Sequence, residues 1–354
     1  MKVLEILKNF FKMNRKNKDQ KLITDGNDVV KTNDFKKSLY VGDIDVKKQP
    51  SIEECIAEFI KQYDIQEKNN PDSSKKAYHA YLRMFCEEED LGDNLANQKK
   101  LGEFLHRKGY ETGFQHSDDR LVYYHIAGEN GIKEENTPNL HKIYINCERK
   151  YISIITAAIF KCIRKIAGDK LQMKCISEQM NGYGLDEDEK EIKNYQRNDK
   201  IVIYAENEEK AKEICNAISL LKLKNPKVFK GIKKTPLLKN QDGFMVVTSK
   251  NLYNYVQTPV GTAAGATFND YISDILYNSV IATFDKELKI DNNKKKYRLD
   301  ERMREYSRIF SEMEDEQKNR IIKNCKDLFV NLCNEANIEL EENNKQNNKD
   351  SYEK

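Results

Sequence analysis

The chain is 354 residues long, with 38% hydrophobic and 34% charged side chains, so it can bury a sizeable core and is not wholly disordered. Its 61 basic and 58 acidic residues leave a net charge of +3, which excludes a global field that would demand a nucleic acid or a membrane as partner. The eight cysteines are scattered without a CxxC pair, which predicts reduced, mostly buried thiols in a cytoplasmic protein and no zinc site.

Residues 1–50 are predicted to form a basic amphipathic start followed by a flexible arm. Leu4, Leu7 and Phe11 stand among lysines in residues 1–18, without the long apolar core of a secretory signal peptide. A helix here would either dock on the protein, which we favour, or make a weak contact with a membrane or a partner. The polar stretch that follows has little to bury.

Residues 51–115 are predicted to form a helical lobe. In "SIEECIAEFIKQY" the apolar residues keep helical spacing, and Ser51 with Glu54 is typical of a capping box. Two more helices are expected near residues 78–85 and 97–110, where aromatic and leucine side chains share a face.

Residues 116–290 are predicted to form a sheet-containing lobe with flanking helices. The runs "RLVYYHIA", "HKIYINC", "LQMKCIS", "DKIVIYA" and "GFMVVTS" are strand-like, and two helical patterns over 148–167 and 206–221 lie between them. A tight loop at 261–266 leads to a helix that Thr267 caps together with Asp270. Residues 291–335 are predicted to contain one long C-terminal helix, over 300–334, and 336–354 a disordered tail. The fold class is therefore mixed α+β.

Five segments resemble, in order and approximate spacing, the HopA1-like family, over about residues 101–284. They are "KIYINCERKYISIITAAI", "MKCIS", "YQRNDKIVIYAE", "NPKVFKGIKKTPLL" and "TPVGTAAGATFNDYISDIL". That family includes type III secretion effectors and the lyase components of class V lanthipeptide and thioamitide biosynthesis. Its pattern is a strand lysine, Arg-x-Asp before an apolar strand, a Pro-rich loop and a small-residue loop with Ser-Phe-Gly-x-x-Arg.

The family motifs match single positions of this chain. Lys174 matches the strand lysine, Arg197 and Asp199 match Arg-x-Asp, and Thr267 with Phe268 matches Ser-Phe. Two positions depart from the pattern, because Asn269 replaces the glycine and Ile272 replaces the arginine. A cation that could hold phosphate is therefore missing from that last position.

For the lyase members, the resemblance implies elimination of phosphate from phosphoserine or phosphothreonine in a peptide, which leaves a dehydroamino acid. This carbon–oxygen lyase would need no metal or cofactor, and a separate kinase-like protein would install the phosphate. Lys174 is the candidate base, with His125 or His116 as acid. Asp199 would orient Arg197, and the candidate phosphate ligands are Arg197, Lys230, Lys233, Lys234 and Thr267.

Other readings of the same residues stay open. Lys174 is about equally consistent with a lysine on the solvent face of a strand, and the three lysines of "FKGIKK" with a solvated loop. A non-catalytic module that binds a peptide or a protein is the alternative function, favoured by Ile272. Nucleic-acid binding ranks last, because no RRM, KH or helix-turn-helix pattern occurs.

Overall fold

The computed structural model describes residues 49–69, 71, 73–87, 89–90, 92–116, 122–177, 197–250, 255–265, 267–290 and 298–341. The side chains of residues 95, 114–116 and 122 are outside this description. The chain divides into two units, Met1–Asp45 and Val46–Lys354, and every described residue belongs to the second. The predictions for residues 1–48 and for the tail after 341 therefore lie outside the described residues. The predicted disorder is wrong for residues 336–341, where Ile338 is buried and Leu340 pairs with Leu238.

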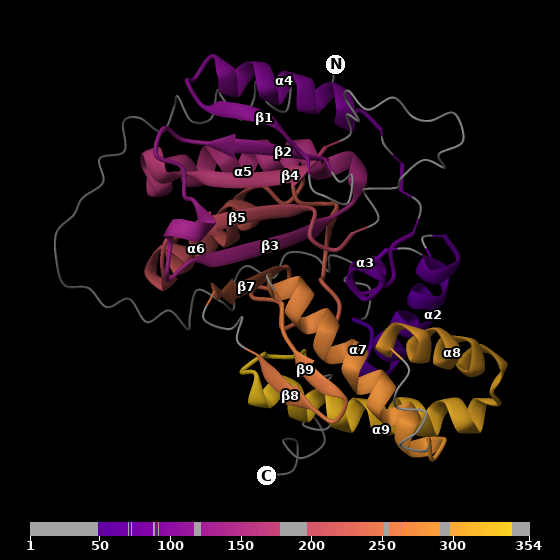
Figure 1. Cartoon of the computed structure of the whole chain (residues 1–354). Coiled ribbons are helices and arrows are strands. Elements are labelled where there is room, and N and C mark those ends of the chain that lie inside the picture. The colour runs from indigo at the N-terminus through magenta and orange to yellow at the C-terminus, as the bar shows by residue number, and fades with distance from the viewer. Residues whose placement is uncertain are drawn as a thin grey trace, which may run out of the picture. The chain divides into compact units, whose positions relative to one another are not determined.

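An antiparallel sheet lies in the part of this unit between residues 111 and 249 (Figure 1). Its strand order is β1-β2-β4-β5-β3, and β6 and β7 both pair with β3. The strands are β1 (Glu111–His116), β2 (Val122–Ala127), β3 (His141–Cys147), β4 (Gln172–Ile176), β5 (Ile201–Ala205), β6 (Ile232–Lys233) and β7 (Met245–Ser249). All five strands predicted between 120 and 249 are present, and the mixed α+β class is confirmed.

Helices α5 (Ile152–Ala167) and α6 (Glu208–Lys224) cover one face of the sheet (Figure 1). Side chains alternate between the two faces of a strand, and Ile143, Ile145, Ile201 and Ile203 point to the face with these helices and are completely buried. α4 (Asn94–His106) extends this layer by contacting α5 and β1.

A helical group packs on part of the opposite face. It consists of α2 (Ile52–Asn69), α3 (Lys76–Arg83), α7 (Phe268–Glu287), α8 (Leu299–Glu312), α9 (Asp315–Glu335) and the hairpin of β8 (Val256–Thr258) and β9 (Gly261–Ala263). Tyr144, Val202 and Val246 from the sheet share one apolar core with this group. Short 3-10 turns lie at η2 (Glu134–Asn136), η3 (Arg149–Tyr151) and η4 (Gly168–Lys170). α4 packs on α5 and β1. The division at residue 115 stays a prediction.

The helix starts follow the predicted capping chemistry. Ser51 and Glu54 form reciprocal hydrogen bonds at the start of α2, and Thr267 and Asp270 form a capping box at the start of α7. α7 is buried almost all round, which explains why its sequence lacks a polar stripe.

The prediction of one long C-terminal helix is wrong, because the segment forms two helices, α8 and α9. The chain is extended at Met313 and Glu314. Asp315 and Glu316 then occupy the first turn of α9, where acidic side chains favour a helix N-terminus. This break lets both apolar stripes reach α7, with Tyr306 of α8 stacked on Phe284 at a centroid distance of 4.9 Å.

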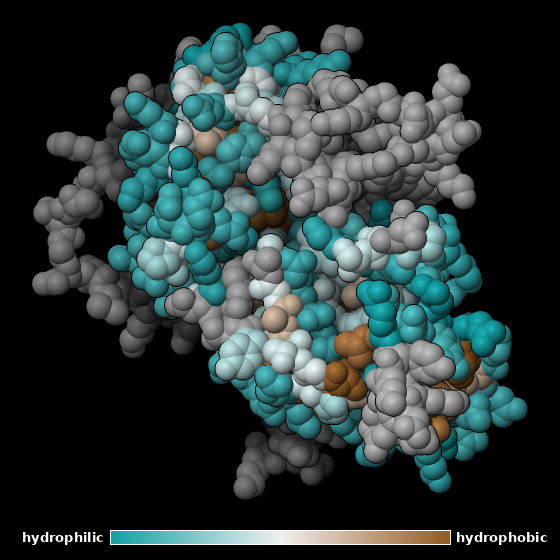
Figure 2. Space-filling model, viewed as in Figure 1, coloured by the Kyte–Doolittle hydropathy of each residue, from teal (hydrophilic) through white to brown (hydrophobic). Residues whose placement is uncertain are grey.

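Hydrophilic residues predominate on the face shown in Figure 2, with smaller hydrophobic areas among them. No helix within the described ranges has the length and apolar content that crossing a membrane requires. All eight cysteines are described and are free thiols, six of them buried and Cys86 and Cys162 half-buried.

Candidate functional site

Lys174 and His125 lie side by side in the centre of the sheet face opposite α5 and α6. The register of β2 and β4 pairs them directly, so both side chains project to one face. Tyr123 is two residues before His125 on that face, and Lys174 Nζ is 4.2 Å from the centroid of its ring. Lys174 is half-buried, which differs from the solvent-exposed alternative.

The environment of Lys174 favours the neutral amine. Burial lowers its pKa most, and the charges of Lys142 and Arg197 lower it further, against Asp199 and Glu134, to about 8. At pH 7 a lysine with this pKa is about one-tenth free amine, far more than an ordinary lysine. Lys174 can therefore accept a proton, as a general base must.

His125 is a poorer acid than the sequence suggested. Burial and the positive charge of Lys174 both lower its pKa, although the contact with Gln172 opposes them. The Nε2 atoms of Gln172 and His125 are 2.5 Å apart. The imidazole is therefore largely neutral at neutral pH and is better suited to accept a hydrogen bond than to protonate a leaving group.

Arg197 and Asp199 form a buried bidentate pair beside Lys174. Arg197 Nε and Nη2 are 2.9 and 3.0 Å from the two carboxylate oxygens, and Nη2 also donates to Tyr78 Oη on α3 at 2.9 Å. Burial alone would lower the pKa of Arg197, but Asp199 outweighs it and the net direction is upward. The guanidinium is thus a permanent cation, and its buried Nη1 has no hydrogen-bond partner in the described part of the chain.

Asn269 is a site residue that the sequence analysis did not identify. Its Nδ2 donates to Asp199 Oδ2 at 2.9 Å, so Asn269 helps to fix the carboxylate that holds Arg197. Thr267, two residues earlier, uses its hydroxyl in the cap with Asp270. Ile272 is completely buried in the helical core, so no group at that position faces a ligand.

The three lysines of the basic loop do not meet at one point. Lys230 is exposed, Lys233 Nζ is 2.6 Å from Glu89, and Lys234 Nζ is 3.7 Å from Glu341. They therefore do not form a single phosphate clamp. The backbone of His116 pairs with Val122 at the end of β1, and its side chain lies outside the described residues.

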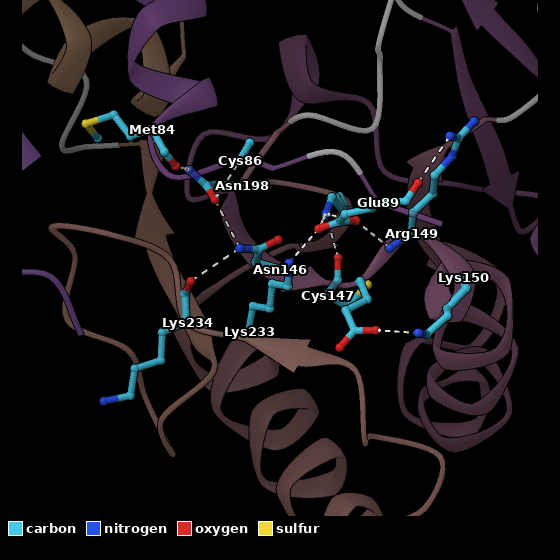
Figure 3. Close-up of polar contacts among 12 residues, drawn as sticks. Met84, Cys86, Glu89, Asn146, Cys147, Arg149, Lys150, Asn198, Lys233 and Lys234 are labelled. Atoms are coloured by element: carbon cyan, nitrogen blue, oxygen red, sulfur yellow. Dashed lines mark hydrogen bonds and ion pairs between the residues drawn. The ribbon is translucent and has the colours of Figure 1, made fainter. Parts of the chain in front are cut away.

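A second charged cluster surrounds Glu89, in the loop between α3 and α4 (Figure 3). Its members are Glu89, Lys200, Lys233 and the backbone N–H of Arg149, and we call it the Glu89 cluster. The sequence analysis identified only Lys233. The signal for the rest was an acidic run, "CEEED", and a lysine directly after Arg-x-Asp.

Within the described ranges, no group of three or more His, Cys, Asp or Glu side chains is arranged to hold a metal ion. No family model matches the chain, and neither does any curated protein.

Solved structures of two effector proteins are similar to this chain, one from Pseudomonas syringae pv. tomato strain DC3000 and one from Pseudomonas syringae pv. syringae strain 61. Each is 14% identical with a TM-score of 0.36 and covers 71% of this chain, and the matches span 98% and 96% of the effector chains. A likeness this remote carries no argument about function, so the argument rests on the residues.

Proposed function

We propose that this chain is a phosphopeptide lyase of the HopA1-like type, which eliminates phosphate from phosphoserine or phosphothreonine and leaves a dehydroamino acid. One observation carries the proposal: Lys174, with a pKa lowered to about 8, lies beside a buried permanent cation at positions that match the family's motifs. The substrate is a peptide or protein segment, phosphorylated beforehand by a separate kinase-like protein.

In this reaction the free amine of Lys174 removes the proton from Cα of the phosphorylated residue. The electron pair of that C–H bond forms the Cα–Cβ double bond, and the Cβ–O bond breaks. The phosphate leaves with the bonding electrons, so the leaving group gains negative charge. A dianionic monoester releases PO4³⁻, which cations stabilise until it takes up a proton from water, and Lys174 returns the Cα proton to water; a neutral His125 fits this scheme.

Arg197 supplies the nearest permanent positive charge for the departing phosphate. Asp199 and Tyr78 occupy its Nε and Nη2, which leaves Nη1 as its unpartnered donor. We assign Nη1 and the charge of Arg197 to phosphate stabilisation, and Asp199 to orientation of the guanidinium. Thr267 and Lys234 have no part in this scheme because the cap and Glu341 engage them.

The first test is mass spectrometry of a phosphoserine and phosphothreonine peptide library after incubation with the protein. The expected product has lost one phosphoric acid. Lys174→Met should lower kcat/KM by about 10²-fold or more, the usual contribution of a general base. The wild-type kcat/KM should rise with pH to a plateau above about 8.

Lys170→Met is the matched control, since Lys170 lies just before β4 and pairs with Glu206 on the surface. Its activity should equal that of the wild type. Full activity of a folded Lys174→Met protein would refute the assignment of the base.

The second candidate is a non-catalytic module that binds a phosphorylated or acidic peptide. The complete burial of Ile272 favours it, because the family's arginine position offers no cation here. This function predicts that phosphopeptides remain intact but co-purify with the protein. Peptides that neither react nor bind would exclude both candidates.

A further inference from the structure

The Glu89 cluster places four charge-assisted hydrogen bonds on one carboxylate. Lys200 Nζ is 2.9 and 2.8 Å from the two oxygens, Lys233 Nζ is 2.6 Å from Oε1, and the Arg149 backbone N–H donates to Oε2 at 2.6 Å. Figure 3 shows Glu89 between Lys233 and Arg149. Donors therefore reach this carboxylate from the start of β5, from β6 and from the 3-10 turn that leads into α5.

The donors are a built arrangement that does not depend on Glu89 alone. The Lys200 side chain is 2% exposed, and Lys200 Nζ also donates to the Cys147 carbonyl at 2.7 Å, which fixes the ammonium group on the sheet. The Arg149 N–H belongs to the turn that begins the α5 segment, where N–H groups and the helix dipole favour an anion. An anion of suitable size would therefore find these donors already in place.

One carboxylate does not balance the positive charge around it. The ammonium groups of Lys200 and Lys233 both contact the Glu89 carboxylate, while Glu148 pairs with Lys150. Burial raises the pKa of Glu89, but Lys200 and Lys233 outweigh it and hold the net pKa below its ordinary value. A phosphate group, with charge of about −1.5 to −2 and three terminal oxygens, would match these donors better than a carboxylate.

The loop that carries Glu89 is anchored at both ends by contacts that do not involve this carboxylate. At one end Asn198 accepts from Cys86 Sγ and donates to the Met84 carbonyl, and at the other Asn94 Oδ1 accepts from the Ser153 N–H. Within the first anchor, between Met84 and Cys86, Phe85 has a φ of 57°, a strained value for an aromatic residue, and is 40% exposed. Glu89 could therefore leave the cluster while the ends of the loop stay in place.

A ligand can approach the cluster from the side of Lys233. Its side chain is 38% exposed, in contrast to 9% for Glu89, and exposed Lys230 lies three residues earlier. The approach is therefore basic, which favours an anionic ligand over a neutral one.

We propose that the Glu89 cluster is a phosphate-binding site in which the chain's own Glu89 acts as an internal ligand. A phosphate monoester on a peptide segment displaces Glu89 and takes the N–H of Arg149 and the ammonium groups of Lys200 and Lys233. This gives Lys233 a role at a site other than the Lys174 face, and it does not rest on the proposed lyase activity. Lys200 belongs to this cluster, while Arg197 and Asp199, one to three residues earlier, contact Tyr78 and Asn269, so one short segment joins the two sites.

The test uses Glu89→Gln in the full chain, which removes the internal charge and keeps the shape of the side chain. Thermal unfolding is followed with increasing inorganic phosphate, at ionic strength held constant with chloride. Phosphate should raise the Tm of Glu89→Gln by at least about 3 °C more than that of the wild type. The added substitution Lys233→Met should abolish this difference.

Glu67→Gln is the matched control. Glu67 is also a largely buried carboxylate between two cations, Lys76 and Arg304, but no helix N–H contributes there. Phosphate should raise the Tm of Glu67→Gln no more than it raises the Tm of the wild type. If phosphate raises the Tm of Glu89→Gln and Glu67→Gln equally, or raises neither, the proposal is overturned and the Glu89 cluster is a structural ion pair.

A measurement on the wild type keeps the proposal testable if Glu89→Gln does not fold. Phosphate should increase amide hydrogen exchange in residues 85–93 without loosening α5, and unchanged exchange would then overturn the proposal. The ligand source is distinguished with a phosphoserine peptide, its unphosphorylated form and an acidic peptide of equal charge. Only the phosphopeptide should bind Glu89→Gln more tightly than inorganic phosphate does, and equal binding of all three peptides would contradict a phosphate site.

Discussion

At the scale of single residues, Lys174 gives a prediction that needs no substrate. Its pKa in the folded protein is about 8, lower than the ordinary 10.5, so the unfolded chain binds more protons between these values. The free energy of unfolding should therefore rise from pH 8 to pH 10 through this residue. Urea unfolding at several pH values gives the free energy of unfolding of the wild type and of Lys174→Met. The difference between the two should grow in favour of the wild type from pH 8 to pH 10. The exposed Lys170→Met control should show no such growth, and parallel pH curves for wild type and Lys174→Met would contradict the lowered pKa.

The residues that the sequence could predict are those that carry a local pattern. Lys174, Arg197 and Asp199 were placed by short motifs, and the structure brings them into one electrostatic environment. Asn269, Glu89 and Lys200 were missed because their roles depend on partners far away in the chain: Asn269 contacts Asp199, and Glu89 contacts Lys200 and Lys233. No periodicity or spacing encodes such contacts.

At the scale of secondary-structure elements, the cap of α7 is the feature of "GATFND" that the structure explains. Thr267 accepts from the Asp270 N–H, and Asp270 accepts from the Thr267 N–H. Thr267→Ala should lower the free energy of unfolding by about 1 kcal/mol, the usual value for an N-cap. Urea unfolding measures this loss. Thr262→Ala is the control, because the Thr262 hydroxyl lies on the exposed β8–β9 hairpin. A loss no larger than that of the control would show that the cap contributes nothing to stability.

Strands and capped helices were predictable because their signals are local, whereas the break between α8 and α9 was not recognised. Met303, Tyr306 and Phe310 continue a helical stripe up to Met313, and no proline or glycine interrupts the chain there. Both helices pack on α7, and contacts of this kind between distant segments leave no local pattern in the sequence. The acidic pair Asp315 and Glu316 was the available signal.

At the scale of the whole Val46–Lys354 unit, the sheet and the helical group are joined by polar contacts as well as by their apolar core. Arg197 reaches Tyr78 on α3, and Asp199 reaches Asn269 on α7. The segment before β5 is thereby tied to two helices that pack against each other. The positions of Arg197 and of these helices should consequently depend on one another.

Asn269→Ala tests this dependence. It removes one hydrogen bond to a buried carboxylate, which should lower the free energy of unfolding by about 1.5–3 kcal/mol. Asn324→Ala is the control, because Asn324 also donates an amide hydrogen bond to a carboxylate, that of Glu287, but from a half-buried position on α9. Its loss of stability should be smaller than that of Asn269→Ala. If urea unfolding gives equal losses for the two variants, Asn269 does not stabilise the join between sheet and helices. If Asn269→Ala shows the larger loss and also shifts the pH at which Lys174 titrates, Asn269 controls the charge environment of the candidate base.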